Sequence, residues 1–419
     1  MSVKKRPTSE TRGASSIFLK KYDLYFYIIK KYSTKKIYNI CYFIYGDIMV
    51  ILDKYDKYLK NKYKNILKEI TIIGITGSSG KTSTSLLTYQ LLNKCNIKTT
   101  YIGEYIKNNI KHKKILSKTP YDIYNYIIES YNNNIKTIII ELNVEDIIKK
   151  IYESIPFDII VCTNLLTDYK NNYGTMNNYI KYKKQILKSL KFKGKTIINI
   201  DDPYNYNFIK RNSITVGFDN AIFKIDKYLL KHNQTEFNFI NKDKKYYVKT
   251  NLIGKNNIYN LSLSLAVLSY FIDISNVIDN LYDLYIPKTY EILNYGNGKI
   301  LIDKAIKIGE IVTVLNTAKL FNKSIYMVLI CNDNIKILSN YIVRNSKRCI
   351  ITSNNINNIL NDNELDNYEL IINKKDAIIK GLSYIRDNGI LLILGKIDDD
   401  IYDIIKESKK IKLDLVNNM

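Results

Sequence analysis

The sequence is poor in residue types on which whole classes of protein depend. Its 419 residues include no tryptophan, 5 prolines, 5 cysteines and 2 histidines. Two histidines, His112 and His232, argue against a histidine-built metal site and against a Ser-His-Asp triad. The cysteines lie far apart, are odd in number and form no C-x-x-C pair. This pattern argues against a disulfide framework and fits reduced thiols in a cytoplasmic protein.

Arginine is scarce as well. Only six of the 64 basic residues are arginine, although the formal net charge is +24. Proteins that read a nucleic-acid sequence usually rely on arginine for bidentate base contacts, whereas the lysines here are spread along the chain among asparagine and tyrosine. We interpret the charge as the composition of an AT-rich coding sequence and expect no specific nucleic-acid partner. A nucleic-acid or anionic-membrane surface is the alternative interpretation.

Long apolar runs are also missing. The most apolar N-terminal stretch, residues 37–52, has about sixteen residues and contains Asp47, whereas a bilayer demands about 18–20 apolar residues. We therefore expect no transmembrane segment. Residues 1–16 are rich in small polar side chains and are predicted to be disordered, with a transit peptide as the alternative. The hydrophobic share of 46% is too high for the whole chain to be disordered.

From about residue 67, short β-branched runs alternate with helical stretches. The apolar runs occupy residues 70–76, 136–142, 158–164, 195–200, 299–303, 324–331, 348–353 and 389–396. Several are apolar at successive positions, which is typical of strands buried on both faces of a parallel sheet. The helical stretches between them occupy residues 82–95, 177–190 and 256–272. Alternation of this kind predicts an α/β protein with doubly wound parallel sheets.

The strongest motif is IGITGSSGKTSTS, residues 73–85. A β-branched strand runs into a short glycine turn, and a helix follows at once. In such a turn the backbone N–H groups surround phosphate oxygens, and the helix N-terminus adds partial positive charge. Lys81 is expected to reach the β- and γ-phosphates, and the Thr82 hydroxyl to bind Mg²⁺. The predicted nucleotide-phosphate site consists of Gly77, Ser78, Ser79, Gly80, Lys81, Thr82 and Ser83.

The tight spacing T-G-x-x-G-K-T after a strand resembles the Mur ligase family of ATP-dependent amide ligases. The resemblance continues in order over roughly 220 residues, as far as the N-x-x-N segment that contains Asn257 and Asn260. It implies that Thr119 and Pro120, within the sequence SKTP, contact the substrate. It also implies that Glu141, at the end of the run KTIIIE, holds Mg²⁺. A carboxylate at the carboxyl end of a neighbouring strand is also a sensible place for a metal ligand.

The most specific stretch is TNLLTDYKNNYGTMNNYIKYKKQIL, residues 163–187. It resembles the T-N-L-x-x-D-H-L-D-Y-H-G-T-M-E-x-Y-x-x-x-K pattern of the tripeptide-synthetase branch of the family. The resemblance implies that Thr163 and Asn164 bind substrate and that Lys183 is the lysine that becomes carbamylated and bridges Mg²⁺. Lys181 and Lys184 are close neighbours in a lysine-rich helix, and Lys183 as an ordinary surface lysine is the alternative.

Three further matches extend the expected nucleotide site. Asn257 and Asn260 fall where the family contacts adenine, and amide side chains suit that task because each offers a donor and an acceptor. Asp303 matches the aspartate of the family's V-D-Y-A-H-x-P motif. The matches predict a central P-loop, parallel-sheet ATPase domain over 67–285 and a smaller Rossmann-like α/β domain over 286–419. A short helical segment is expected over 1–66.

The sequence departs from the family pattern in several places. Tyr169 and Tyr173 stand where the family has histidines, and Thr289 stands where an arginine meets phosphate, with Lys288 adjacent. Lys304, Ala305 and Ile306 follow Asp303, so the motif's histidine is lost. Residues 353–357 lack the arginine of the amine-binding D-N-P-R motif. The segment before residue 67 is also too short for the family's usual UDP-binding domain.

The resemblance implies an ATP-dependent acid–amino-acid ligase with Lys81, Glu141 and Lys183 as catalytic residues. Mg²⁺ is expected on Thr82, Glu141 and Lys183, and ATP is the expected nucleotide. The expected acid is a UDP-N-acetylmuramoyl-peptide, as in peptidoglycan precursor synthesis. A ligase for a poly-γ-glutamate or folate-type acid is one alternative, and a non-catalytic nucleotide-binding subunit or scaffold is another. A P-loop kinase or GTPase fits less well, because it leaves the G-T-M and N-x-x-N segments unexplained.

Overall fold

The computed structural model describes residues 58–103, 119–166, 173–331, 345–353, 367–385 and 388–417, except for the side chains of 409–417. The chain divides into two compact units, Met1–Tyr63 and Lys64–Met419. Most of the helical segment predicted for residues 1–66 lies outside the described residues, and its described end includes helix α3 (Lys64–Glu69). The domain boundaries expected from the sequence stay predictions. Everything below concerns the second unit.

The first part of this unit is built on a nine-stranded sheet with the order β2-β3-β1-β4-β5-β6-β7-β8-β9. Its strands are β1 (Thr71–Thr76), β2 (Thr99–Ile102), β3 (Thr137–Glu141), β4 (Phe157–Cys162), β5 (Leu190–Asn199), β6 (Ile214–Gly217), β7 (Phe223–Leu230), β8 (Thr235–Asn241) and β9 (Lys244–Thr250). Neighbours from β2 to β7 are parallel, whereas β7, β8 and β9 form an antiparallel meander. All five residues of β3 are buried, as expected for a strand covered on both faces.

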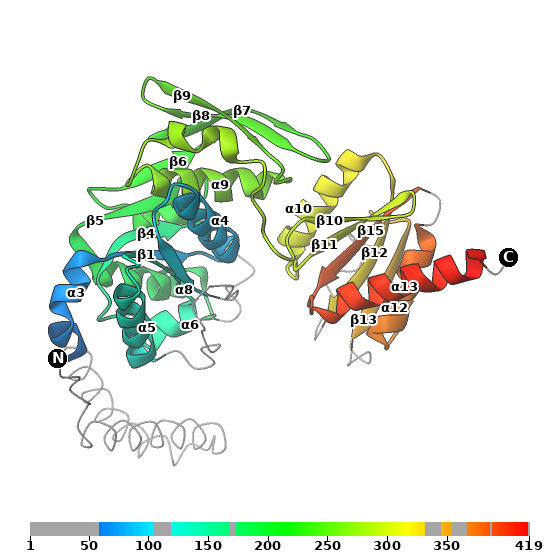
Figure 1. Ribbon diagram of the computed structural model, residues 1–419, viewed down its shortest axis with the longest axis horizontal. Helices are drawn as coiled ribbons and strands as arrows, with labels where there is room; N and C mark the ends of the chain where they lie inside the picture. Colours follow the sequence, from blue (N-terminus) through cyan, green and yellow to red (C-terminus); the bar gives the residue numbers. More distant parts are fainter. Residues whose placement is uncertain are drawn as a thin grey trace, which may run out of the picture. The chain divides into compact units, whose positions relative to one another are not determined.

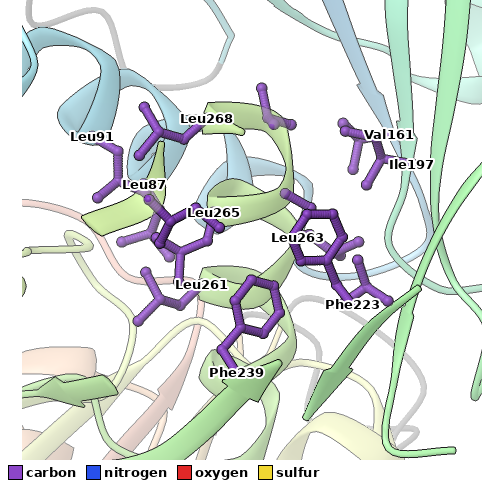
Figure 2. Packing of buried hydrophobic residues seen from close by; sticks show 14 of the residues in the cluster. Leu87, Leu91, Val161, Ile197, Phe223, Phe239, Leu261, Leu263, Leu265 and Leu268 are labelled. Atoms are coloured by element: carbon purple, nitrogen blue, oxygen red, sulfur yellow. The ribbon is translucent and has the colours of Figure 1, made fainter. Parts of the chain in front are cut away.

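The helices of this part are α4 (Lys81–Lys94), α5 (Pro120–Asn132), α6 (Val144–Ile148), α8 (Met176–Lys184) and α9 (Lys255–Leu268). Figure 1 shows α4 and α9 side by side, although they are far apart in the sequence. Their leucines share one core cluster with Phe223 and Phe239 of the sheet (Figure 2). Small hydroxyl side chains allow the two helices to approach closely, since Thr88 Oγ1 donates to Ser264 Oγ at 3.1 Å. The second half of α9 is thereby held against the middle of α4.

The second part contains a six-stranded sheet with the order β10-β11-β15-β12-β13-β14. Its strands are β10 (Glu291–Tyr295), β11 (Gly298–Asp303), β12 (Ser324–Cys331), β13 (Arg348–Ser353), β14 (Tyr368–Leu370) and β15 (Gly389–Gly395). Only β10 is antiparallel to its neighbour among these described strands. Helix α10 (Ile308–Ala318) packs in one core cluster, and α12 (Lys374–Tyr384) and α13 (Asp400–Asn417) pack in another (Figure 1). Helices therefore cover both faces of this sheet.

The α/β class expected from the sequence is confirmed, and each of the eight apolar runs overlaps a strand. The antiparallel meander β7–β9 was not expected. β7 begins and β9 ends with buried and exposed residues in alternation, and most exposed positions of these two strands carry lysine or tyrosine. The β8–β9 turn also lacks glycine. Lys242 adopts the positive φ there, at 53°. The usual hairpin signal is therefore absent from the sequence.

Within the described residues, no helix is both long enough and apolar enough to cross a bilayer.

Candidate functional site

The phosphate loop joins the end of β1 to the start of α4 and requires glycine at two positions. Gly77 and Gly80 have φ values of 153° and 78°. A Cβ atom on Gly77 would lie 1.8 Å from Thr163 Oγ1, and one on Gly80 would lie 2.5 Å from Asn260 Oδ1. Both contacts are shorter than atoms tolerate, so the loop conformation depends on these residues lacking a side chain.

The end of β4 holds this loop in place. Asn164 accepts hydrogen bonds from Ser78 N through its backbone oxygen and from Ser79 N through Oδ1, both at 2.8 Å. Thr163 Oγ1 donates to Ser79 O at 2.6 Å. The sequence predicts that Thr163 and Asn164 bind substrate. In the structure their side chains fix the backbone of the phosphate loop, while both residues also line the cavity described below.

Helix α8 fixes the loop from another side. Ser78 Oγ accepts from Leu166 N at 2.9 Å and shares a 2.8 Å hydrogen bond with the Tyr179 hydroxyl. One turn further along α8, Lys183 Nζ donates to Gly77 O at 2.7 Å and lies 5.1 Å from the centre of the Tyr179 ring. Two residues of α8, Tyr179 and Lys183, therefore hold two consecutive residues of the phosphate loop.

Lys183 is the one buried lysine of α8. It is 1% exposed, whereas Lys181 and Lys184 are exposed. Burial, and then the nearby charge of Lys81, lowers the pKa of Lys183 well below its usual value. A neutral amine is the form that reacts with carbon dioxide, so this environment is compatible with the carbamate that the resemblance implies. The metal-bridging role stays a prediction.

Lys81 lies over the loop. Its Nζ atom donates to Gly77 O at 3.1 Å and to Ser78 O at 3.4 Å. The charge of Lys81 is thus held against the carbonyl oxygens of the first two loop residues. Thr82 and Ser83 begin the first turn of α4, where the helix dipole favours an anion.

Glu141 ends β3 directly beside β1, where it pairs in register with Ile75. The carboxylate is buried, and the Tyr101 hydroxyl donates to Glu141 Oε1 at 2.5 Å. No group of three or more His, Cys, Asp or Glu residues suited to a metal occurs among the described residues.

Asn257 and Asn260 lie at the start of α9, against the phosphate loop. Asn260 Nδ2 donates to Asn257 Oδ1 at 3.1 Å, and Thr84 Oγ1 donates to Asn260 Oδ1 at 3.3 Å. Asn257 Nδ2 donates to Ile253 O at 2.9 Å. These contacts link the first turn of α9 to the first turns of α4. Contact with adenine stays a prediction, and both residues line the cavity.

Thr119 and Pro120 lie at the N-terminus of α5. Asp122 N donates to Thr119 Oγ1 at 3.2 Å, and Asp122 Oδ2 accepts from Thr119 N at 3.0 Å, which forms a capping box with proline in the first turn. Capping of α5 therefore explains why threonine and proline stand at positions 119 and 120. Substrate contact by these two residues stays a prediction.

Asp303 ends β11 and is almost completely buried. Its carboxylate accepts from Tyr290 N at 2.9 Å and from Ala305 N at 2.8 Å, and burial raises its pKa to about 7. The carboxylate therefore fixes the backbone turn after β11.

A cavity of about 310 Å³ brings together most of the residues predicted from the sequence. The predicted residues that line it are Ser78, Ser79, Gly80, Lys81, Thr82, Ser83, Thr163, Asn164, Asn257, Asn260 and Asp303. The cavity lining does not include Gly77, Thr119, Pro120, Glu141 or Lys183. The structure thus joins the phosphate loop, the start of α9 and the end of β11 around one cavity.

The sequence interpretation missed several residues of this region. Tyr259, Tyr290, Lys307 and Glu310 line the cavity without having been expected to contribute. Lys307 and Glu310 lie within seven residues of the Asp303 match, so their position in the sequence was the available signal.

The motif tyrosines fall partly outside the described residues. Tyr169 and residues 354–357 lie outside them, whereas Tyr173 stacks on Tyr179 with ring centres 5.2 Å apart. The Tyr173 hydroxyl donates to Glu145 Oε1 at 2.5 Å. Tyr173 thus supports the side chain that holds Ser78.

Comparison with known proteins identifies related sequences and folds. Residues 75–268 match the Mur ligase middle domain. The 2,6-diaminopimelate-adding UDP-N-acetylmuramoyl-L-alanyl-D-glutamate ligase of Clostridium botulinum is 30% identical, covering 83% of this chain and 77% of the relative. UDP-N-acetylmuramyl-tripeptide synthetase 2 of Oceanobacillus iheyensis is 24% identical, covering 83% and 76%.

Two solved structures share the fold. MurF ligase from Thermotoga maritima, in complex with ADP, superposes with a TM-score of 0.65 at 16% identity, covering 86% of this chain and 84% of that one. Folylpolyglutamate synthase from the same organism has a TM-score of 0.56 at 12% identity, covering 84% and 94%. At these identities the likeness establishes the fold alone.

Proposed function

This chain belongs to the Mur ligase family, and we propose that it uses ATP to join an amino acid to a UDP-N-acetylmuramoyl-peptide in peptidoglycan precursor synthesis. The proposal for the acid rests on the names of the relatives, which are ligases for such peptides. The proposal for ATP rests on the phosphate loop and on the ADP complex of a protein with the same fold. The expected cytoplasmic location stays a prediction.

The observation that supports the proposal most directly is the shape of the phosphate loop. Its two glycines leave space that a side chain would fill, and its conformation is fixed by Asn164, Tyr179 and Lys183. A loop held by buried hydrogen bonds on several sides is ready to surround phosphate before the ligand arrives. Such preorganisation is what electrostatic stabilisation of phosphoryl transfer requires.

In the proposed reaction the substrate carboxylate oxygen attacks the γ-phosphorus, and the bond to the β-phosphate oxygen breaks to release ADP. The amine nitrogen then attacks the acyl carbon of the acyl phosphate, inorganic phosphate leaves, and the amine loses a proton. Lys81 and the N-terminus of α4 stabilise the negative charge on the transferred group. Gly77 and Gly80 keep the loop in a shape that leaves space for the phosphates.

The residues present fit Mg²⁺ in part. Thr82 lines the cavity and offers a hydroxyl oxygen, and the Glu141 carboxylate lies at the end of the strand beside the loop. As an amine, Lys183 donates to Gly77 O, so it offers oxygen ligands only if it is carbamylated. When bound, the ion would neutralise phosphate charge.

The test is release of ADP by the purified chain with Mg²⁺ and ATP across a panel of acids and amino acids. The acids include a UDP-N-acetylmuramoyl-dipeptide, a folate-type acid and a γ-glutamyl acid. We expect ADP release only when the muramoyl acid and an amine are both present, and none from the Lys81→Ala variant. Nucleotide binding without turnover for any pair would instead support a nucleotide-binding scaffold.

A further inference from the structure

Glu141, the carboxylate expected to hold Mg²⁺, ends the strand beside the phosphate loop. It pairs in register with Ile75, and the loop begins two residues further along the chain, at Gly77. Beyond β3, Leu142 N donates to Ile75 O at 2.9 Å, and Leu142 O accepts from Thr76 Oγ1 at 3.2 Å. These bonds fix the main chain after Glu141 against the end of β1.

Two tyrosine hydroxyls hold Glu141 directly. The Tyr152 hydroxyl donates to Glu141 O at 3.1 Å and so fixes the main chain. The Tyr101 hydroxyl donates to Glu141 Oε1 at 2.5 Å and so fixes the side chain. All three residues are buried. A hydrogen bond to a carboxylate is short and strong, so the bond from Tyr101 restricts the orientations that the Glu141 carboxylate can adopt.

The Tyr101 ring occupies space that Gly103 leaves open. Tyr101 lies on β2, which pairs with β3, and Gly103 follows that strand. A Cβ atom on Gly103 would lie 2.1 Å from the Tyr101 hydroxyl oxygen and 2.3 Å from its Cζ atom, so no side chain fits there unless the ring moves. The Tyr126 hydroxyl donates to Tyr101 O at 3.0 Å and holds the main chain of Tyr101. The ring is thus kept with its hydroxyl on Glu141.

Lys183, the other residue expected to hold Mg²⁺ from outside the loop, is linked to the same stretch of main chain. Its Nζ atom donates to Gly77 O at 2.7 Å and to Thr76 Oγ1 at 3.4 Å. Thr76 Oγ1 in turn donates to the carbonyl oxygen of Leu142, the residue after Glu141. Mg²⁺ demands near-ideal octahedral geometry, so the orientation of each oxygen ligand matters for its binding.

We propose that Tyr101 is a positioning residue for Mg²⁺, because its hydroxyl holds the Glu141 carboxylate in one orientation for the ion. This inference rests on the proposed function, which assumes that Glu141 binds Mg²⁺. Hydrogen-bond partners of this kind orient metal ligands, and the loss of one usually weakens metal binding by about tenfold to a hundredfold. If Tyr101 served only to satisfy a buried carboxylate, its loss would lower stability and leave the dependence on Mg²⁺ unchanged.

The test measures ATP binding by titration calorimetry over a series of Mg²⁺ concentrations, without acid or amine, on the parent and on Tyr101→Phe. This variant keeps the ring and removes only the hydroxyl. The Mg²⁺ concentration that gives half of the increase in ATP affinity should rise by about tenfold to a hundredfold. ATP affinity measured in excess EDTA should stay within about twofold of the parent, because Tyr101 acts through the ion.

Tyr124→Phe is the matched control. Tyr124 is also a buried tyrosine, but its hydroxyl donates to Ser154 O at 3.0 Å rather than to Glu141. This variant should lose stability as Tyr101→Phe does and keep the Mg²⁺ dependence of the parent. Gly103→Ala is a second test, since it keeps the Tyr101 hydroxyl but displaces the ring, and it should also raise the half-saturating Mg²⁺ concentration.

The outcomes separate this inference from the proposed function. An unchanged Mg²⁺ dependence in Tyr101→Phe, or an equal change in Tyr101→Phe and Tyr124→Phe, would overturn the role of Tyr101. If Glu141→Gln raises the half-saturating Mg²⁺ concentration but Tyr101→Phe does not, the metal site stands and only the inference is wrong. If Glu141→Gln has no effect, or the parent binds no ATP, the proposed function fails and the inference fails with it.

Discussion

The phosphate loop and the turn after β11 line the same cavity but are built differently. The loop is shaped by its backbone, which is fixed by hydrogen bonds with Asn164, Tyr179 and Lys183, of which the last two are buried. The turn after β11 presents the side chains of Lys304 and Lys307. A backbone site depends on a few irreplaceable residues, whereas a site made of charges needs only the right sign at the right place. This difference explains why the loop keeps the family pattern while the turn departs from it.

Gly80→Ala should have the largest effect on ATP binding, because it changes the backbone of the phosphate loop directly. The new Cβ atom would lie 2.5 Å from Asn260 Oδ1 on a residue with φ 78°. We expect ATP binding to fall by about a hundredfold or more, from strain of roughly 1–3 kcal/mol added to loss of loop shape. Gly309→Ala is the control, since nothing lies within 4 Å of its Cβ position in α10. Calorimetry showing equal ATP binding by the two variants would contradict this view of the loop.

Lys183→Met should lower ADP release without lowering thermal stability. The variant removes the Nζ contact with Gly77 O and any carbamate, and we expect ADP release to fall by about a hundredfold or more, as for loss of a group that acts in the transition state. Thermal stability should hold or rise, because a buried amine with a lowered pKa is replaced by an apolar chain of similar size. Lys184→Met, on the exposed side of α8, is the control for both measurements. If Lys183→Met instead has a lower Tm and full ADP release, Lys183 serves stability and not the reaction.

Asp303 gives the C-terminal side a pH dependence in the range from about pH 4 to pH 7. Its pKa is about 7 in the folded protein against a usual value of 3.8, because the carboxyl is buried. Between these pH values the folded state keeps a proton that the unfolded state has released. This group's contribution to stability is therefore lost as the pH rises from about 4 to about 7 and is constant above that.

The measurement is thermal unfolding of the parent and of Asp303→Asn from pH 4 to pH 8. The difference in Tm between the two proteins should shift by a few degrees over this range, with the parent losing more stability as the pH rises. The amide side chain of the variant has one oxygen where the carboxyl has two, so a constant offset in Tm is also expected. A difference that does not change with pH would show that the Asp303 carboxyl titrates near its usual value.

Tyr179→Phe should have the smallest effect. It removes only the hydroxyl bonded to Ser78 Oγ and keeps the ring beside Lys183. We expect the KM for ATP to rise by about two- to tenfold, corresponding to one hydrogen bond of about 0.5–1.5 kcal/mol. Tyr182→Phe is the control, because Tyr182 lies on the same helix but its ring contacts Tyr173. An unchanged KM in Tyr179→Phe would mean that the remaining contacts already fix the loop.

The sequence allowed prediction of the loop more fully than of its supports. The glycines and Lys81 follow one another in the chain, and the strand before them and the helix after them have strong local signals. The supports come from distant segments: Tyr179 and Asn260 reach the loop only because α8 and α9 pack where they do. Thr163 and Asn164 were assigned to substrate, since a motif match reveals that residues matter but not what they touch.

The C-terminal side was harder to predict for a different reason. With six arginines in the whole sequence, a missing arginine carries little information about function. Lys304 and Lys307 line the cavity fifteen and eighteen residues beyond Thr289, and hydrogen bonds to Asp303 fix the turn before them. The antiparallel meander was missed because its β8–β9 turn, Lys242 and Asp243, lacks the glycine of the usual hairpin signal.

The most direct test of the central claim follows the oxygen atoms of the acid. The acid is labelled with ¹⁸O in its reacting carboxylate and incubated with the chain, ATP, Mg²⁺ and the amino acid, and the released phosphate is analysed by mass spectrometry. An acyl-phosphate ligase transfers one labelled oxygen to each phosphate, in step with amide formation, and the account predicts this result. Amide product with unlabelled phosphate, or ADP release that proceeds without the acid, would contradict it.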